Sequence, residues 1–219
     1  MQRHRVLMPL PDWLGDFFSE AGEVFATDDD RMRLAVALSR RNVVAGTGGP
    51  FGAAVFECET GRLVAAGVNV VEASCCAAAH AEVVALSLAG QKRGHYDLSR
   101  EPACELATSC EPCSMCLGAV HWSGVRRLLC GARKADAEAV GFDEGDKPAD
   151  WAALLAGRGI EVVRDLCRAE AAAVLADYAR TAGAIYNPRR PRPAAGRGKS
   201  EARSSESEGS TKHEPENAG

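Results

Sequence analysis

The chain has 219 residues, of which 46% are hydrophobic, and its formal net charge is −4 at pH 7. This length allows one domain with a sizeable core plus short extensions. The sequence has no apolar run long enough to span a membrane, and an acidic chain argues against a nucleic-acid groove, which needs clustered positive charge. We therefore expect neither a membrane nor a nucleic-acid partner.

The two ends of the chain differ from its middle. Residues 1–26 are typical of a short helix or of a docking segment, and their apolar members are Trp13, Leu14, Phe17 and Phe18. Residues 188–219 are rich in Pro, Gly, Ser and charge without apolar periodicity, which predicts a disordered tail. Residues 188–219 carry a net charge of +2, which leaves −6 for residues 1–187. A basic arm that binds nucleic acid is the less favoured interpretation of the tail. The sequence thus predicts one domain over residues 27–187.

Between these ends, apolar periodicity changes repeatedly between that of helices and that of strands. The pattern predicts helices at 28–44, 79–88, 113–123, 150–156 and 167–181. A hairpin turn joins the first two of the predicted strands, which lie at 53–56, 63–71, 105–108, 127–131 and 160–163. Two strands followed by strand–helix alternation predict an α/β fold with a mixed five-stranded sheet between two layers of helices.

One pair of motifs carries ligands for a metal. His80-Ala81-Glu82 is followed by Pro112-Cys113-Ser114-Met115-Cys116. Cys113 and Cys116 are three residues apart, so on the first turn of a helix both sulfurs face the same side, where the helix N-terminus favours thiolates. Together with His80 they would give zinc three ligands and leave the fourth position open for water, as in a catalytic site. We predict one zinc ion per chain.

Glu82 lies two residues from His80 and is not needed as a ligand. A carboxylate in that place can accept a proton from an activated water and pass it to the substrate, so we predict that Glu82 is catalytic. A Cys-x-x-Cys pair can also be a redox pair or half of a structural zinc site. A structural site would need a fourth ligand, and the remaining cysteines of this region form no second pair at finger-like spacing: Cys75, Cys76, Cys104 and Cys110.

These motifs resemble those of the cytidine deaminase superfamily, over about residues 31–143. Gly49-Pro50-Phe51-Gly52-Ala53 and Asn69 look like the guanine deaminase and nucleoside deaminase branch. The resemblance implies a three-layer α-β-α, cytidine deaminase-like fold. It also implies zinc-dependent hydrolytic deamination of a purine base or nucleoside, with guanine, converted to xanthine and ammonia, as the favoured substrate.

The same resemblance implies a set of substrate-binding residues: Phe51, Asn69, Ala81, Trp122, Asp143 and Tyr186. Phe51 would stack on the base, Asn69 would hydrogen-bond it, and Trp122 would be a pocket aromatic. Asp143 would lie near the departing amino group, and Tyr186 would belong to a C-terminal segment that closes the pocket. Plainer roles stay open: Asn69 could cap a turn, Phe51 and Trp122 could pack in the core, and Asp143 could be a solvated loop residue.

Substrate choice is left open by one departure from the family. Relatives usually have Asp-Pro-Thr before the Ala-His-Ala-Glu run, and this chain has Cys76-Ala77-Ala78. Editing of an adenosine in tRNA would use the same four residues. A non-catalytic, zinc-stabilised partner subunit is the third interpretation, and the presence of Glu82 speaks against it.

The remaining expectations concern assembly and location. Relatives are commonly dimers, so we expect a homodimer with a small-molecule nucleobase or nucleoside as substrate. Nine cysteines without a secretory signal indicate a reducing compartment, which favours the cytoplasm.

Overall fold

The computed structural model describes residues 7–181 and 183–187, and the predicted tail at 188–219 lies outside them. None of the helices in these ranges is long and apolar enough to cross a membrane. The helices are α1 Trp13–Ala21, α2 Asp28–Val44, α3 Val71–Ser74, α4 Ala81–Arg93, α5 Ser114–Ser123, α6 Lys134–Ala139, α7 Trp151–Ala156 and α8 Arg168–Arg180. The strands are β1 Gly52–Glu57, β2 Leu63–Val68, β3 Cys104–Cys110, β4 Arg127–Ala132 and β5 Glu161–Val163.

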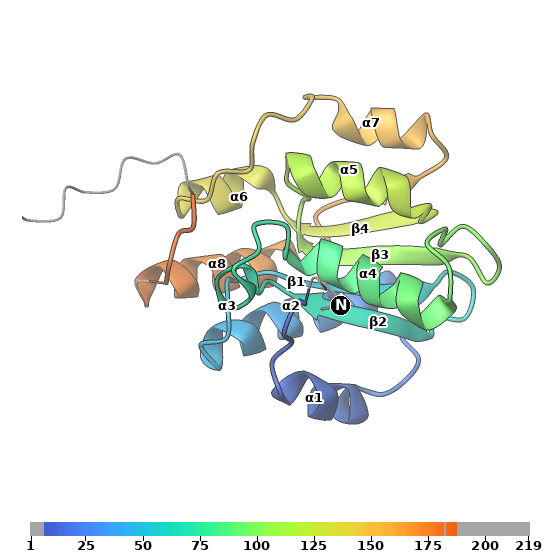
Figure 1. Ribbon diagram of the computed structural model, residues 1–219. Helices are drawn as coiled ribbons and strands as arrows, with labels where there is room; N and C mark the ends of the chain where they lie inside the picture. The colour runs from blue at the N-terminus through green and yellow to red at the C-terminus, as the bar shows by residue number, and fades with distance from the viewer. Residues whose placement is uncertain (1–6, 182, 188–219) are drawn as a thin grey trace, which may run out of the picture. The chain divides into compact units, whose positions relative to one another are not determined.

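The strands form one mixed sheet in the order β2-β1-β3-β4-β5, of which Figure 1 labels β2, β1, β3 and β4. β1 runs antiparallel to both of its neighbours, whereas β3, β4 and β5 are parallel to one another. In register, Leu106 of β3 lies opposite Val55 of β1 on one side and Leu128 of β4 on the other. The mixed five-stranded sheet predicted from the sequence is therefore confirmed.

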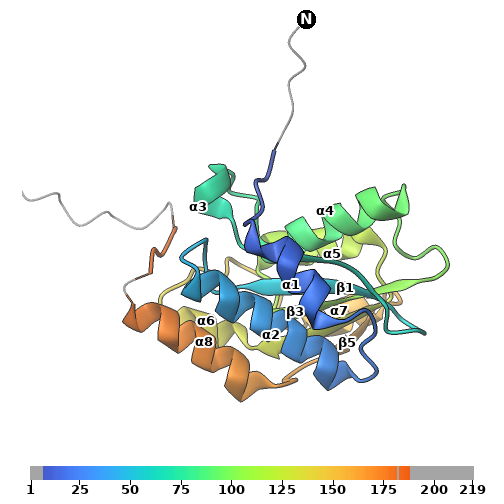
Figure 2. The same cartoon turned by 90° about the horizontal axis from the view of Figure 1, so that it is seen from below.

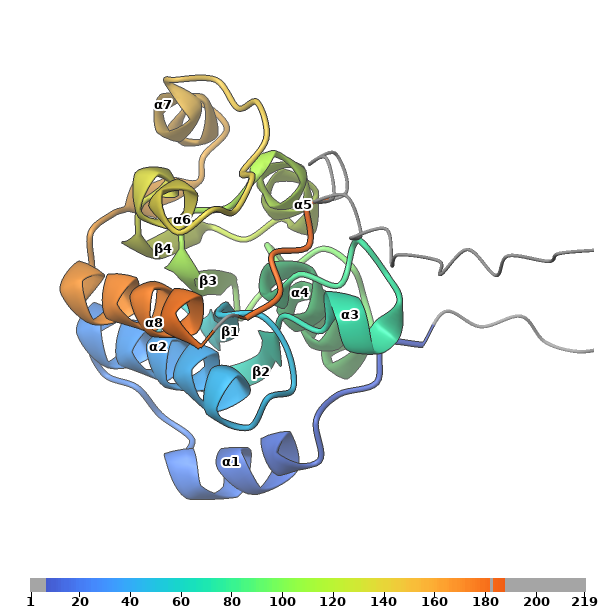
Figure 3. The same ribbon diagram turned by 90° about the vertical axis from the view of Figure 1, so that its left-hand side faces the viewer.

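Helices cover both faces of this sheet, which gives three layers (Figure 3). Alternate residues of a strand point to opposite faces, so β1 places Ala54 and Phe56 in one hydrophobic cluster and Ala53 and Val55 in the other. The first cluster lies under α2 and α8, and the second under α4, α5 and α7. The predicted α-β-α architecture is confirmed.

Several element boundaries differ from those expected. The helix expected at 79–88 starts at Ala81, because His80 is extended and serves as its N-cap, and it continues to Arg93 before Gly94 at a φ of 72°. The strand expected at 63–71 ends at Val68, which pairs with Gly52 at the start of β1, and Val71 already belongs to the short helix α3. At the N-terminus the helix alternative holds: α1 buries Leu14 against the core.

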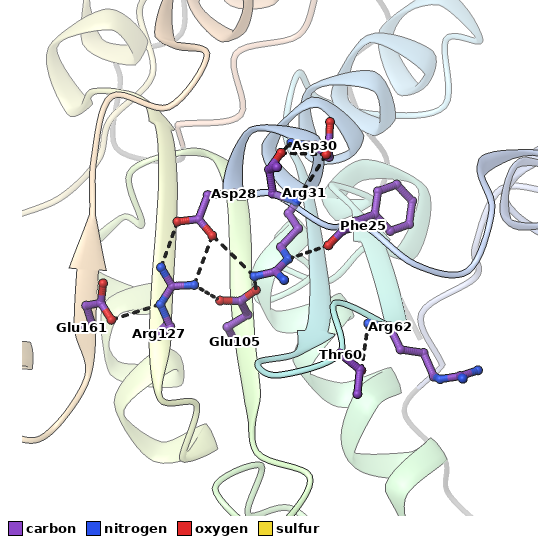
Figure 4. Close-up of polar contacts among 10 residues, drawn as sticks. Phe25, Asp28, Asp30, Arg31, Thr60, Arg62, Glu105, Arg127 and Glu161 are labelled. Carbon is purple, nitrogen blue, oxygen red and sulfur yellow. Dashed lines mark hydrogen bonds and ion pairs between the residues drawn. The ribbon is translucent and has the colours of Figure 1, made fainter.

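An ionic cluster of five side chains lies at the N-terminal end of β3 (Figure 4): Asp28, Arg31, Glu105, Arg127 and Glu161. Glu105 is fully buried and accepts hydrogen bonds from Arg31 and from Arg127, the latter at 2.6 Å. Arg127 also donates to Asp28 at 2.9 Å and to Glu161 at 3.1 Å. Each acid thus has a guanidinium partner, and the cluster joins α2, β3, β4 and β5.

Candidate metal centre

The opposite end of the sheet carries the metal ligands. β3 ends at Cys110, and a short loop leads to α5, whose N-cap is Cys113 in an extended conformation (φ −64°, ψ 173°). His80 is the N-cap of α4, which lies beside α5 on the same face of the sheet (Figure 2). The N-terminal turns of both helices therefore meet, and their free N–H groups favour negative charge between them.

The three predicted ligands come together at this point. His80 Nδ1 lies 3.6 Å from Cys113 Sγ and 3.6 Å from Cys116 Sγ, and the three ligand atoms all lie within 4.8 Å of one another. A tetrahedral zinc with Zn–S bonds of about 2.3 Å and a Zn–N bond of about 2.0 Å needs ligand atoms separated by roughly 3.5 Å. Two thiolates and one imidazole thus fit zinc and leave one coordination position for a substrate or water.

The two thiols differ in acidity. A hydrogen bond from Cys116, together with His80, lowers the pKa of Cys113 to about 4, despite its burial. The same bond raises the pKa of Cys116, and burial adds to this rise. Metal ligation needs both sulfurs deprotonated, so a divalent cation that binds the pair displaces its remaining protons.

Glu82 lies on the first turn of α4, only 6% exposed. Burial raises its pKa, as does the neighbouring Cys113 thiolate. A carboxyl group whose pKa moves toward neutrality can both accept and release a proton, as a general acid–base residue must. Ala81, the other residue of this motif in the predicted set, has its side chain in the hydrophobic cluster under α4 and α5.

A second buried carboxyl group, Glu144, was missed in the sequence. It is 6% exposed, and burial raises its pKa to about 8, with further contributions from Cys113 and Glu82. Its backbone oxygen accepts a hydrogen bond from Ser114 N at 3.0 Å, which fixes it beside the first turn of α5. The loop has no apolar periodicity that would indicate a buried position for Glu144. The two consecutive acidic residues after Phe142 were the one feature of the sequence that could have indicated it.

Asn69 has a buried hydrogen-bond donor without a partner among the described residues. Its side chain is 1% exposed, and its Nδ2 makes no hydrogen bond. A Cβ atom added to Gly49 would lie 3.2 Å from Asn69 Oδ1 and 3.0 Å from Tyr186 Oη, so these three residues surround one point. Asn42 holds Gly49 and Asn69 together, because its Nδ2 donates to Gly49 O and to Asn69 O, both at 2.9 Å.

Aromatic rings close the site. Phe51 packs against Phe142 with ring centroids 4.9 Å apart, and Phe142 lies 5.5 Å from Tyr186. The Tyr186 ring lies 6.3 Å from His80 of the same chain. Asn187 anchors this C-terminal segment. Its Nδ2 donates to Gly141 O at 2.9 Å, and its Oδ1 accepts from Asp143 N at 3.2 Å.

Two predicted substrate-binding residues lie elsewhere. Trp122 is 79% exposed at the last turn of α5, in a shallow surface groove with Tyr96, whereas the ligands lie at the other end of this helix. Within its own chain Trp122 therefore lies away from the metal ligands. Asp143 is exposed, and its carboxylate accepts a hydrogen bond from Gly145 N at 2.9 Å, so the buried acid of this turn is its neighbour Glu144.

Comparison with known proteins supports this geometry. Residues 26–132 match the cytidine and deoxycytidylate deaminase zinc-binding region, so zinc is the metal of this centre. The chain is 42% identical over 125 residues to the guanine deaminase of Bacillus subtilis, covering 54% of this chain and 77% of that protein.

Two solved structures extend the similarity. A guanine deaminase from Nitrosomonas europaea superposes with a TM-score of 0.77 at 48% identity, covering 82% of this chain and 99% of that one. A variant of the protein NE0047 in complex with 8-azaguanine superposes with a TM-score of 0.77 at 49% identity, covering 80% of this chain and 98% of that one.

Proposed function

Since the chain belongs to the cytidine and deoxycytidylate deaminase family, within its guanine deaminase-like branch, we propose that this zinc-dependent deaminase hydrolyses guanine to xanthine and ammonia. Relatives named as guanine deaminases and the 8-azaguanine complex support guanine as the substrate.

The unpartnered Nδ2 of Asn69 carries the proposal, whereas its Oδ1 accepts a long hydrogen bond from Val71 N at 3.4 Å. A buried donor left without an acceptor costs about 1–3 kcal/mol, so its place beside Gly49 and Tyr186 favours a ligand that offers an acceptor. Guanine offers such acceptors at O6 and N7, on edges away from its amino group. A base held there by Asn69 would direct its amino-bearing carbon toward the metal ligands.

The two buried carboxyl groups would move the protons. When bound, zinc supplies a Lewis acid that makes water a strong nucleophile at neutral pH. Glu82 takes a proton from that water and donates it to a ring nitrogen of the base. Glu144, whose pKa is raised to about 8, donates a hydrogen bond or a proton to the amino group that leaves as ammonia.

The aromatic residues would exclude bulk water. Phe51, Phe142 and Tyr186 form a ring cluster beside His80, and such apolar walls suit the faces of a flat base. Walls of this kind favour a free base over a nucleotide inside folded RNA. The body of the chain, with a net charge of −6, also lacks the positive field that binding to tRNA requires.

We further propose a homodimer in the cytoplasm. The surface groove that contains Trp122 and Tyr96 is lined mainly by apolar groups of α4 and α5, with both rings largely exposed. A second copy of the chain would cover these rings, and closed twofold symmetry is the commonest arrangement of such contacts. This would give Trp122 a packing role at the subunit contact.

Ammonia release from a panel of compounds tests the substrate. Zinc-loaded protein is incubated separately with guanine, adenine, cytosine, guanosine and a tRNA that carries an adenosine in its anticodon. We expect ammonia and xanthine in equal amounts from guanine, at a rate well above that with the other compounds. Ammonia from the tRNA alone, or from none of them, would reject the proposal.

A further inference from the structure

A buried cation lies beside the metal ligands, and the proposed proton transfers make no use of it. Lys147 has a side chain only 4% exposed, and its Nζ donates to Pro112 O at 2.9 Å. The same ammonium lies 3.4 Å from Glu111 Oε2 and 4.7 Å from the centroid of the Trp151 ring. Taking an ammonium out of water is costly, so its presence here calls for a role beyond filling space.

The contact with Pro112 fixes the direction from which Cys113 approaches the metal. The proline ring fixes φ of Pro112, so ψ of Pro112 is the torsion that orients the peptide leading into Cys113. The carbonyl oxygen of Pro112 turns with this torsion, and Lys147 holds that oxygen. Glu111 is fixed in turn by its N–H donation to Ala132 O at 2.8 Å and by Arg164 at 2.8 Å.

The loop that carries Lys147 also carries Glu144. Ser114 N donates to Glu144 O at 3.0 Å, and Lys134 Nζ donates to Gly145 O at 3.0 Å. Lys147 completes this attachment three residues farther along, where it reaches back to the residue that precedes the first cysteine ligand. One ammonium thus couples the thiolate loop to the loop of the second carboxyl group.

We propose that Lys147 is a positioning residue of the zinc centre: through Pro112 O and Glu111 it sets the orientation of Cys113 and keeps Glu144 beside the site. The kinetic part of this inference rests on the proposed deamination of guanine. The structural part rests on the zinc ligands alone.

A matched pair of variants separates this role from general stability. Lys147→Met removes a buried cation from Glu111, which keeps Arg164 as its partner. Arg31→Met removes a buried cation from Glu105, which keeps Arg127, at the other end of β3. Both variants are prepared with cobalt(II) in place of zinc, because the visible spectrum of cobalt reports the geometry of its ligands. Release of the metal to a chelator is timed on the same samples.

We expect the cobalt spectrum of Lys147→Met to differ from that of the unchanged protein, and its metal to be released ten- to a hundredfold faster, as for other partners of metal ligands. With zinc and guanine, kcat of Lys147→Met should fall ten- to a hundredfold while KM changes less than threefold.

Arg31→Met should lower the melting temperature and leave the spectrum, metal release and kcat unchanged. Lys147→Gln keeps a donor for Pro112 O without the charge, so its metal release and kcat should lie between those of the unchanged protein and those of Lys147→Met. It replaces Lys147→Met if that variant does not fold.

An unchanged cobalt spectrum and metal release in the Lys147 variant would overturn the inference. Equal changes in Lys147→Met and Arg31→Met would overturn it as well, because they would indicate a general loss of stability. The spectrum and the chelator assay need no substrate, so an error about guanine would leave both readouts intact.

Discussion

The two ends of strand β3 contain similar side chains put to different uses. At the N-terminal end, Glu105 accepts from Arg31 and Arg127, and the cluster around it satisfies its own charges (Figure 4). At the C-terminal end, beyond Cys110, the carboxyl groups of Glu82 and Glu144 are buried and form no salt bridge within the described part of the chain, and the amide of Asn69 has an unpartnered donor. Paired polar groups stabilise the fold, whereas an unpaired donor beside the metal ligands, such as Asn69 Nδ2, costs stability and suits a site that binds a ligand.

The largest effect is expected from Glu82→Gln. The amide keeps the shape of the carboxyl group and cannot carry the proton, so kcat should fall about 10²- to 10⁴-fold. Zinc content, measured by elemental analysis, should stay at one ion per chain, because the ligands are His80, Cys113 and Cys116. Turnover near that of the unchanged protein would mean that another group moves the proton.

Glu105→Leu tests the opposite end of the strand. It leaves the buried Arg31 with only its longer contact to Asp28 at 3.4 Å, and breaking a buried pair in this way costs about 3–5 kcal/mol. We expect the melting temperature to fall by roughly 10 °C, with kcat at 25 °C within about twofold of the unchanged protein. Glu161→Gln is the matched control, because this exposed partner of Arg127 should contribute less than about 1 kcal/mol. A large loss of kcat in folded Glu105→Leu would show that the two ends are not independent.

Asn69→Ala removes an unsatisfied donor. The free energy of unfolding should change by less than about 1 kcal/mol, whereas kcat/KM for guanine should fall about 10- to 100-fold through the lost hydrogen bond to the base. Asn42→Ala is the control, because both donors of that amide are satisfied by Gly49 O and Asn69 O. We expect it to lower the free energy of unfolding by about 1–3 kcal/mol. Equal destabilisation by both variants would mean that Asn69 is an ordinary turn residue.

The smallest effect concerns pH. A hydrogen bond from Arg127 lowers the pKa of Asp28 below its ordinary value, so this pair adds stability above the unfolded pKa of about 3.9 and loses it as the pH falls further. Asp28→Asn should therefore be less stable by about 1 kcal/mol at pH 7. The difference should shrink in chemical denaturation below about pH 4. A difference that stays constant down to pH 2 would show that the charge of Asp28 is not its source.

The sequence predicted what short-range spacing determines. Cys113 and Cys116 lie one helical turn apart, and His80 and Glu82 share one helix start, so the metal centre followed from the chain itself. The mixed sheet followed from strands with apolar residues on both faces, such as Ala53–Phe56 of β1.

What the sequence did not predict depends on contacts between distant segments. Glu144 was missed in favour of Asp143, because which of two adjacent acids turns inward depends on the hydrogen bond between Ser114 N and Glu144 O. Trp122 was placed in the pocket by resemblance, but the helix that starts at the ligands carries it to the surface within two turns. The role of Lys147 depends on its contact with Pro112, 35 residues earlier in the chain.

Zinc titration of the metal-free protein tests most directly the claim that the C-terminal end of β3 is a catalytic zinc centre. Zinc is added stepwise to the metal-free chain, and xanthine formation from guanine is followed at each step. We predict no turnover without metal, a linear rise, and a plateau at one zinc per chain that the Glu82→Gln variant does not show. Turnover in the metal-free chain, or binding of one zinc without any xanthine, would contradict this account.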